Sequence, residues 1–260
     1  MHANCYWITG TPRTGSMWTT NIVRGIFDLS GFNVLPKEFQ TDEAKLDEIF
    51  LRDVINNESE RDRFVMKGHR KLNTSLPKTK FIVNKRNPYE ICASFFEFMK
   101  SDLQTAVDIA KALKEEINHY GALGPEKCLF IEYNDIVDRP RDVIQQLSEY
   151  CQVKLSSAQQ QDLAQRFSKD NVKRQIDEGR RTWTTGSNDF ELVGGFQGHI
   201  RLFDKKTGFQ SGHISNRESG QWRYAFSLRQ SQIVVSALDA TATSLGYPSE
   251  KRNLERLLAL

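Results

Sequence analysis

Residues 8–18 read ITGTPRTGSMW, and this stretch decides the fold. The apolar run that ends before Gly10 predicts a buried strand, and the segment that follows Gly15 carries apolar residues at helical spacing. A strand, a glycine-containing turn and a helix therefore follow one another directly. The two glycines have the spacing of the phosphate-binding loop GxxxxGK[ST], but Ser16 and Met17 stand where that loop has its Lys and its magnesium-binding hydroxyl. The sequence thus raises the question of which anion, if any, this loop binds.

The rest of the chain predicts a parallel sheet. Short apolar strands are predicted at 63–69, 80–86 and 127–133, and helices at 44–55, 89–100, 103–120, 228–245 and two or three times between 140 and 176. Because strands and helices alternate, we expect an α/β fold of three layers, with a mostly parallel central sheet and helices on both faces. Residues 179–217 have scattered glycines and no sustained period, which is typical of an irregular lid or substrate loop. We expect residues 1–260 to form one domain.

Composition narrows the function classes. The 260 residues are 38% hydrophobic, and the formal net charge of +3 is too mild for bulk nucleic-acid binding but compatible with a basic pocket for an anionic small molecule. The four cysteines form no CxxC pair and have no zinc-like spacing to histidine, so we expect buried free thiols. The sequence shows no pattern of a signal peptide. Its apolar runs are all shorter than the ~20 residues that a membrane span requires. We therefore expect a cytoplasmic protein.

The opening loop has the chemistry of an anion site. If the strand, turn and helix are correct, the backbone N–H groups at the start of the helix point at a common spot, where the helix dipole also favours negative charge. Arg13 adds a fork of donors suited to phosphate or sulfate oxygens, and Trp18 can offer a flat face to a purine. A strand-to-helix turn with a solvated Arg13 and a core Trp18 is the alternative interpretation.

Two motifs together resemble a known family. PRTGSMW (12–18) resembles the PKSGTTW loop of sulfotransferases, which bind the 5′-phosphosulfate of 3′-phosphoadenosine 5′-phosphosulfate (PAPS). FIVNKRNPYEICASFFEF (81–98) resembles the second signature, a strand running into RNPxDxxxS, which grips the 3′-phosphate through Arg86 and Ser94. Glu90 departs from the usual Asp. On this resemblance the loop residues expected to bind the donor are Arg13, Thr14, Gly15, Ser16, Met17 and Trp18.

A third segment supplies the implied catalytic groups. VMKGHRKL (65–72) resembles the K-T-H segment of the same family and puts Lys67 and His69 at the carboxyl edge of the sheet, where ligands of open α/β sheets collect. The resemblance implies that His69 is the general base, while Lys67 and Arg13 stabilise the charge that builds on the leaving phosphate. Gly68 replaces the family's Thr.

Three weaker motifs complete the implied donor site. LFIEYNDI (129–136) resembles a strand that ends in a Tyr near the adenine, which points to Tyr133, and Ser168 stands where the family often has an adenine-contacting Ser. GHISNRESGQWRYAF (212–226) resembles the C-terminal RKGxxGDWKxxF segment, with Gly220, Trp222 and Phe226 in register. Its Arg-Lys-Gly is replaced by Ser215, Asn216 and Arg217, and which of these three contacts the 3′-phosphate stays open.

The resemblance implies a complete reaction. A PAPS-dependent sulfotransferase moves the sulfuryl group to a hydroxyl or amine, releases adenosine 3′,5′-bisphosphate (PAP) and requires no metal. We expect a small-molecule, lipid or carbohydrate acceptor, no nucleic-acid partner and an open oligomeric state. The acceptor pocket is expected from residues 35–55, the helix after Ser94 and residues 179–217. The aromatic residues of that last segment either wall the pocket or pack the lid: Trp183, Phe190, Phe196, Phe203 and Phe209.

The sequence leaves two other functions open. A P-loop nucleoside or small-molecule kinase shares the strand, loop and helix, but it should have the Lys-Ser/Thr pair and a magnesium carboxylate. A non-catalytic nucleotide-binding protein of the same fold would retain the pocket without turnover, and the presence of Lys67 and His69 speaks against it.

Overall fold

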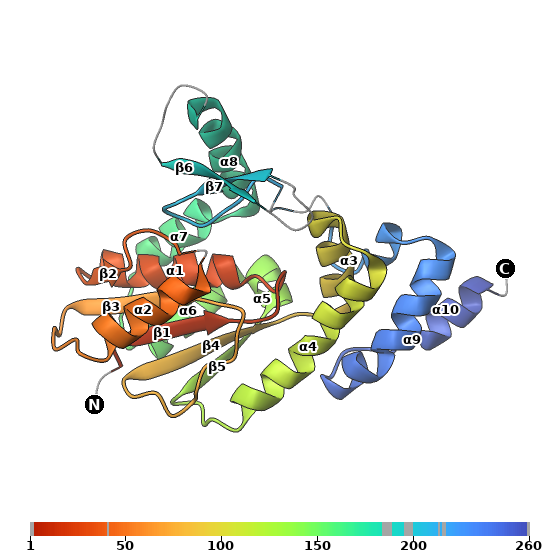
Figure 1. The fold of residues 1–260 in the computed structure, drawn as a ribbon, viewed down its shortest axis with the longest axis horizontal. Helices are drawn as coiled ribbons and strands as arrows, with labels where there is room; N and C mark the ends of the chain where they lie inside the picture. Colours follow the sequence, from red (N-terminus) through yellow and green to blue (C-terminus); the bar gives the residue numbers. More distant parts are fainter. Residues whose placement is uncertain are drawn as a thin grey trace.

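The core of the protein is a parallel sheet at the centre of a computed structural model that describes residues 3–40, 42–183, 189–194, 200–212, 214 and 217–258. Its five strands lie in the order β2-β3-β1-β4-β5, and every neighbouring pair is parallel (Figure 1). The strands are β1 (Cys5–Thr9), β2 (Asn33–Leu35), β3 (Asp62–Lys67), β4 (Thr79–Lys85) and β5 (Cys128–Glu132). The predicted α/β class is confirmed, whereas the three-residue strand β2 was not predicted.

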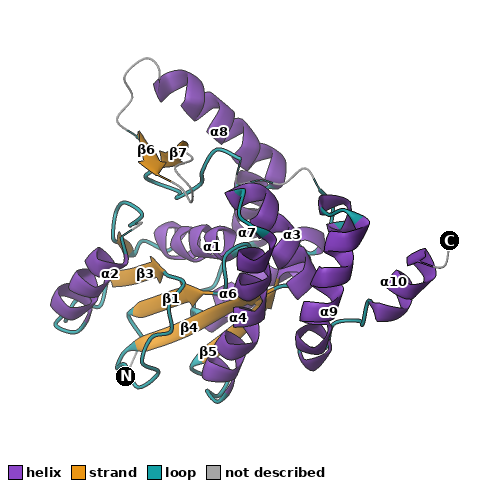
Figure 2. Cartoon of the chain, turned by 45° about the vertical axis from the view of Figure 1, so that its right-hand side comes forward, coloured by secondary structure: helices purple, strands orange, loops and turns teal. Residues whose placement is uncertain are grey.

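Helices cover both faces of this sheet (Figure 2). In chain order they are α1 (Ser16–Leu29), α2 (Glu43–Ile49) with a π-helical continuation η1 (Phe50–Val54), α3 (Pro88–Met99), α4 (Leu103–Gly121), α5 (Tyr133–Asp138), α6 (Pro140–Tyr150), α7 (Ser157–Arg166), α8 (Lys169–Trp183), the 3₁₀ turn η3 (Trp222–Ala225), α9 (Leu228–Ser244) and α10 (Lys251–Leu258). Local signals explain several starts: Asn87 caps α3 ahead of a proline at its first position, and Ser156 with Gln159 forms a capping box on α7.

Strand β1 shows why the sheet needs cover on both sides. All five of its residues are buried, and their side chains alternate between two cores. Tyr6 and Ile8 pack with α1, α6 and α7, while Cys5 and Trp7 pack with α2, η1 and α4. A third core joins α3 and α4 to α9 and α10 at the far side of the molecule (Figure 1). The sheet edge is thereby held from both faces.

The segment 179–217 is more regular than the sequence predicted. Helix α8 continues to Trp183, and β6 (Phe190–Gly194) pairs antiparallel with β7 (Ile200–Asp204) as a hairpin that stands with α8 above the sheet (Figure 1). The expectation of an irregular loop is wrong for these residues, because two strands of only five residues each leave too weak a period in the sequence.

The cysteines and the helices were also subjects of sequence predictions. All four cysteines, Cys5, Cys92, Cys128 and Cys151, are buried free thiols, as predicted. None of the described helices combines the length and the apolar character that a membrane crossing requires.

Candidate functional site

The site lies where the strand order of the sheet reverses. The chain leaves β1 in the centre, forms β2 and β3 on one side, and then crosses to β4 on the other. Ligands of open α/β sheets bind outside the carboxyl ends of the strands at this kind of switch point. The loop 10–15 follows β1 there, and Lys67 and Arg86 end or follow the two neighbouring strands.

Two glycines shape the loop between β1 and α1. Gly10 has φ 141° and Gly15, the N-cap of α1, has φ 91°, conformations that side chains rarely adopt. A β-carbon on Gly10 would lie 2.6 Å from the carbonyl oxygen of Asn84 in β4, so no larger residue fits. The hydroxyl of Thr14 donates to the carbonyl of Thr11 at 2.8 Å and is buried inside the loop. The backbone N–H groups at the start of α1 remain directed outward for an anion.

Arg86 ties this loop to β4. It is 8% exposed, and its guanidinium donates to the carbonyl oxygen of Arg13 at 3.0 Å and to the carboxylate of Glu90 at 3.2 Å. The other carboxylate oxygen of Glu90 accepts from the backbone N–H of Gly220 at 2.8 Å, which gives this departure from the family pattern a structural role. The Nε–H of Arg86 is buried without a hydrogen-bond partner among the described residues. A buried donor of this kind fits a ligand oxygen.

Arg13 is the cation of the loop. Its Nε–H donates to the hydroxyl of Ser94 at 2.9 Å, and its guanidinium lies 4.1 Å from the ring centre of Phe98 in α3. Burial, and then repulsion from Arg86 and Arg201, lowers the pKa of Arg13 to about 9. An anion bound among these guanidinium groups would remove the electrostatic repulsion. The predicted pair of Arg86 and Ser94 is thus brought to the same place as the predicted loop.

His69 and Lys67 form a contact at the end of β3. The Nδ1 of His69 lies 2.7 Å from the carbonyl oxygen of Gly10, and its Nε2 lies 2.8 Å from the Nζ of Lys67. A carbonyl oxygen only accepts, so the proton belongs on Nδ1 and the lone pair on Nε2, where the ammonium donates. The protein packed around the imidazole, and then the charge of Lys67, lowers the pKa of His69 to about 3. His69 is therefore neutral near pH 7.

Packing explains why a glycine stands at position 68, between Lys67 and His69. A β-carbon at Gly68 would lie 2.3 Å from the indole of Trp7, which is fully buried in β1. The indole occupies the volume that a threonine side chain would need. The departure from the family's K-T-H segment is therefore compensated by a large side chain on the neighbouring strand.

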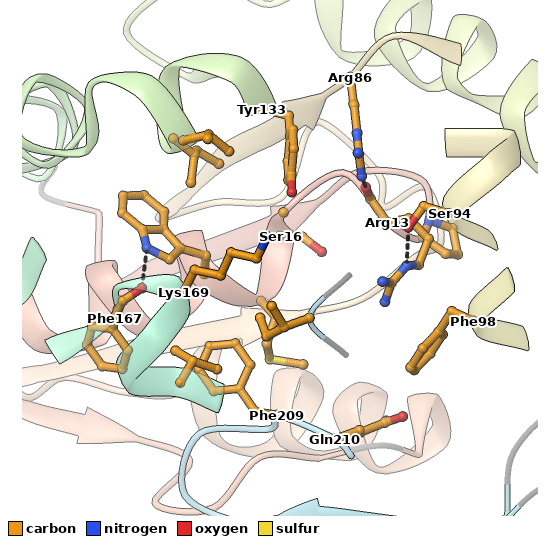
Figure 3. A pocket seen from close by; sticks show the side chains of 18 of the residues that line it. Arg13, Ser16, Arg86, Ser94, Phe98, Tyr133, Phe167, Lys169, Phe209 and Gln210 are labelled. Carbon is orange, nitrogen blue, oxygen red and sulfur yellow. Dashed lines mark hydrogen bonds between the residues drawn. The ribbon is translucent and has the colours of Figure 1, made fainter. Parts of the chain in front are cut away.

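These groups open into one cavity of about 560 Å³ (Figure 3). Among its described lining residues there is no Asp or Glu, and six are cationic: Arg13, Lys67, Arg86, Lys169, Arg201 and Arg217. A cluster of one sign within low-dielectric walls attracts a polyanion. A smaller cavity of about 400 Å³ adjoins it at Arg13, Ser94, Phe98 and Arg217. No group of three His, Cys, Asp or Glu able to hold a metal ion occurs among the residues that the structure describes.

The cavity has an apolar wall suited to a flat ring. Trp18 is held there by its indole N–H, which donates to the carbonyl oxygen of Phe167 at 3.1 Å (Figure 3). Further apolar groups on this wall are Met17, Ile136, Val137, Pro140 and Val172. Ser168 lines the cavity and accepts from the N–H of Asn171, so it also caps α8. Tyr133 lines it too, with the Arg86 guanidinium 3.8 Å from its ring centre. Tyr133 begins α5 and does not end the strand, a correction of the sequence prediction.

Only part of the C-terminal motif, residues 212–226, lies at the cavity. Arg217 lines both cavities and forms an ion pair with Glu97, and burial lowers its pKa. Ser215 and Asn216 lie outside the described residues. Trp222 is 1% exposed and stacks on Tyr89 with ring centres 4.9 Å apart, so its contribution is packing. The aromatic residues of segment 179–217 also have different positions. Phe209 lines the cavity, Phe203 is buried, and Phe190 packs near Gly179. Phe196 and the side chain of Trp183 lie outside what the structure describes.

Among the lining residues that the sequence did not single out are Phe98, Lys169 and Arg201, although the helix after Ser94 and residues 179–217 were expected to shape the acceptor pocket. Phe98 continues the α3 row at four-residue spacing from Ser94, so helical periodicity was a usable signal. Lys169, which points toward Ser16 in Figure 3, and Arg201 on β7 have no motif around them. Only the folded chain brings these two cations to the cavity.

Comparisons with known proteins agree with this geometry. A family model described as a sulfotransferase domain matches residues 4–239. The fold is similar to that of mouse sulfotransferase SULT7A1 complexed with PAP, with a TM-score of 0.63, 12% identity, and coverage of 98% of this chain and 88% of that chain. It is also similar to retinol dehydratase in complex with androsterone and inactive cofactor PAP (TM-score 0.60, 14% identity, 92% of this chain, 80% of that chain) and with retinol and PAP (0.58, 15%, 92%, 81%). At such identities the likeness to these structures concerns the fold. No curated protein sequence matches the chain.

Proposed function

The chain belongs to the sulfotransferase domain family, and on this premise we propose that it transfers the sulfuryl group of PAPS to the hydroxyl or amine of a small-molecule acceptor and releases PAP. The observation that carries the proposal is the cavity itself. It has six cations and no carboxylate among its described lining residues, and it joins a helix N-terminus to a neutral histidine. This combination suits an anionic donor with a base nearby.

The donor's phosphates have matching partners. The 5′-phosphosulfate fits the N–H groups at Gly15 to Trp18 together with Arg13, and the 3′-phosphate fits Arg86 and Ser94. The buried Arg86 Nε–H without a partner supports this assignment, because a phosphate oxygen would satisfy it. Arg217 is the described candidate of the C-terminal motif. Thr14 would act through its backbone, since its hydroxyl is used inside the loop.

The adenine fits the apolar wall. Trp18 supplies an aromatic face whose orientation is fixed by its bond to the Phe167 carbonyl. Tyr133 and Ser168 lie on the same cavity and would offer their hydroxyl groups to the base. Retinol dehydratase and mouse SULT7A1, which share the fold, are described as PAP complexes, and this supports the same nucleotide for the present chain.

His69 is placed to be the general base. In transfer, the acceptor oxygen or nitrogen forms the bond to sulfur, the bond from sulfur to the bridging phosphate oxygen breaks, and the acceptor proton passes to Nε2 of His69. The Gly10 carbonyl holds the Nδ1 proton and keeps Nε2 as the accepting atom. The Lys67 ammonium, which donates to Nε2 at 2.8 Å, would move to the bridging oxygen and free the base. Arg13 would share the charge of the leaving phosphate.

The acceptor is proposed to be largely apolar. Phe95, Phe98, Met99, Val193 and Phe209 wall the side of the cavity nearest the hairpin. The named complexes of retinol dehydratase contain androsterone and retinol, which supports a pocket of this character on the shared fold. The four unpaired buried cysteines support a reducing compartment such as the cytoplasm.

The test is a labelled transfer assay. Purified protein is incubated with sulfur-labelled PAPS and a panel of hydroxyl and amine acceptors, and we expect label in at least one acceptor together with stoichiometric PAP. In parallel, thermal unfolding is measured with PAP and with ATP plus magnesium. We expect stabilisation by PAP; stabilisation by ATP and magnesium alone would favour the kinase, and PAP binding without transfer would favour the non-catalytic protein.

A further inference from the structure

The hairpin contributes one buried cation to the cavity. Arg201 of β7 is 9% exposed and lines the cavity beside Val193, its partner in the β6–β7 pairing. Its guanidinium lies 3.9 Å from the ring centre of Phe98, the same ring that Arg13 approaches at 4.1 Å. Two cations therefore converge on one aromatic ring in a partly enclosed space.

No carboxylate neutralises Arg201. The described residues place no Asp or Glu oxygen within ion-pair distance of it, whereas Arg86 pairs with Glu90 and Arg217 with Glu97. The residues outside the described ranges contain no Asp or Glu, so none of their side chains supplies the missing charge. Burial of an arginine without a counter-charge is unfavourable unless a ligand provides one.

Part of the guanidinium is already used. Its two terminal nitrogens donate to the backbone carbonyl of Phe98 and to the sulfur of Met99, at the C-terminal end of α3, where the helix dipole favours a cation. A guanidinium carries five N–H donors. Two bonds to the described residues leave three donors for a ligand in the cavity, so the helix end holds Arg201 in place without exhausting it.

Arg201 comes from a different part of the chain than the groups suited to the donor, although Arg13 approaches the same Phe98 ring. Most donor groups lie at the ends of β1, β3 and β4 and at the start of α1, and Ser94 lies on α3. Along α3, Glu90, Ser94 and Phe98 follow at four-residue spacing, so Phe98 stands one turn, roughly 6 Å, further from the sheet than Ser94. Arg201 contacts that outer turn, and the apolar residues Val193 and Phe209 line the same cavity.

We propose that Arg201 binds an anionic group of the acceptor. The acceptor is then a molecule with a hydroxyl or amine at one end, an apolar body, and a carboxylate, sulfate or phosphate that reaches the guanidinium fork. This inference rests on the proposed function and adds the charge class of the substrate. It makes Arg201 a specificity residue, because a neutral analogue leaves the buried charge uncompensated.

The experiment compares the turnover of acceptors that carry a carboxylate with the turnover of their uncharged methyl esters. Wild-type protein and Arg201→Gln are assayed with PAPS and 3-(4-hydroxyphenyl)propanoate, its longer-chain homologues, and the methyl ester of each. We expect the wild type to prefer the best acid over its ester by roughly 10- to 100-fold in kcat/KM. Arg201→Gln should lose this preference because kcat/KM falls much further for the acid than for its ester, and the KM for PAPS should change less than the acid-to-ester ratio. Arg201→Lys, which keeps the charge without the fork, should retain part of the preference.

Lys206→Gln is the matched control. Lys206 lies in the turn that follows β7, its side chain is 70% exposed, and it is not among the described residues that line the cavity. Lys206→Gln should leave the ratio of kcat/KM for each acid to kcat/KM for its ester unchanged. The inference is overturned if the wild type treats each acid and its ester alike. It is also overturned if Arg201→Gln raises the KM for PAPS while the acid-to-ester ratio stays constant, since Arg201 would then serve the donor.

A binding measurement separates this inference from the proposed function. Titration calorimetry of the same acids and esters into PAP-saturated protein does not require turnover. Tighter binding of the acids that disappears in Arg201→Gln supports the inference even if no panel member is sulfated. Equal binding of both classes contradicts it, whereas failure of the protein to bind PAP or transfer label to any acceptor contradicts the proposed function itself.

Discussion

The two walls of the cavity are built in different ways. On the sheet side, main-chain groups hold the functional side chains: the Gly10 carbonyl holds His69 and the Arg13 carbonyl holds Arg86. On the hairpin side, Val193 and Arg201 sit on two short paired strands that are not part of the five-stranded sheet. Backbone bonds anchored in a buried sheet fix positions more firmly than side-chain contacts from an added hairpin. We infer that the sheet wall determines the reaction and the hairpin wall determines the substrate.

The largest expected effect is on the sheet wall. His69→Ala should lower kcat by about 10²- to 10⁴-fold, the range that a general base contributes, because the acceptor proton then has no placed acceptor. The stabilisation of the protein by PAP should remain. The measurements are steady-state kinetics with PAPS and thermal unfolding with PAP.

His119→Ala is the control for this change. His119 is half-buried in α4 and its ring contacts the Leu72 carbonyl outside the cavity. Turnover of this variant should stay near wild type. Equal kcat in the wild type and in His69→Ala would remove His69 from the mechanism, and an equal loss in both histidine variants would point to a general loss of structure.

The second-largest expected effect is a loss of affinity for the donor nucleotide when the sheet wall is changed. Arg86→Ala should weaken PAP binding by roughly 10- to 100-fold, because charge-assisted bonds to a phosphate are lost. The change also leaves Glu90 as a buried carboxylate without its cation, which is itself destabilising. Calorimetric titration with PAP measures the loss.

A double variant separates affinity from folding. Arg86→Ala with Glu90→Gln removes the unpaired charge, while the glutamine oxygen can still accept from the Gly220 N–H. This protein should unfold near the wild-type temperature and still bind PAP weakly. Recovery of full PAP affinity in the double variant would show that Arg86 serves only the fold.

The smallest expected effect is on the hairpin wall. Val193→Ala shortens an apolar side chain that lines the cavity and should raise the acceptor KM about 3- to 10-fold, since two methyl groups leave the contact. The KM for PAPS should not change. Leu192→Ala is the control, because Leu192 is 50% exposed on the opposite face of the strand. A raised KM for PAPS in Val193→Ala would contradict the division between the two walls.

The same division explains how much the sequence predicted. The pattern of strand, turn and helix predicts the loop after β1, whereas the expected roles of Lys67 with His69 and of Arg86 with Ser94 come from the resemblance to the sulfotransferase family. Parallel strands bring their carboxyl ends together, so residues predicted from separate motifs meet at one edge of the sheet.

The hairpin wall could not be assembled in this way. The strands of residues 190–194 and 200–204 are short and lie outside the five-stranded sheet, so neither gives a strong period. Arg201 reaches the cavity through tertiary contacts with Phe98 and Met99, which lie about a hundred residues away in the sequence. Tyr133 was found but assigned to a strand, because an apolar run does not show where a strand gives way to a helix.

The contact of Gly68 with Trp7 has a consequence for the history of the chain. A side chain at 68 and the indole at 7 compete for the same space, with only 2.3 Å between the added β-carbon and the ring. Neither position can therefore drift independently: a larger residue between Lys67 and His69 is acceptable only after Trp7 has become smaller. We expect the two positions to covary among related chains, so a search that demands threonine beside the histidine at position 69 would overlook those relatives that, like this one, keep the tryptophan.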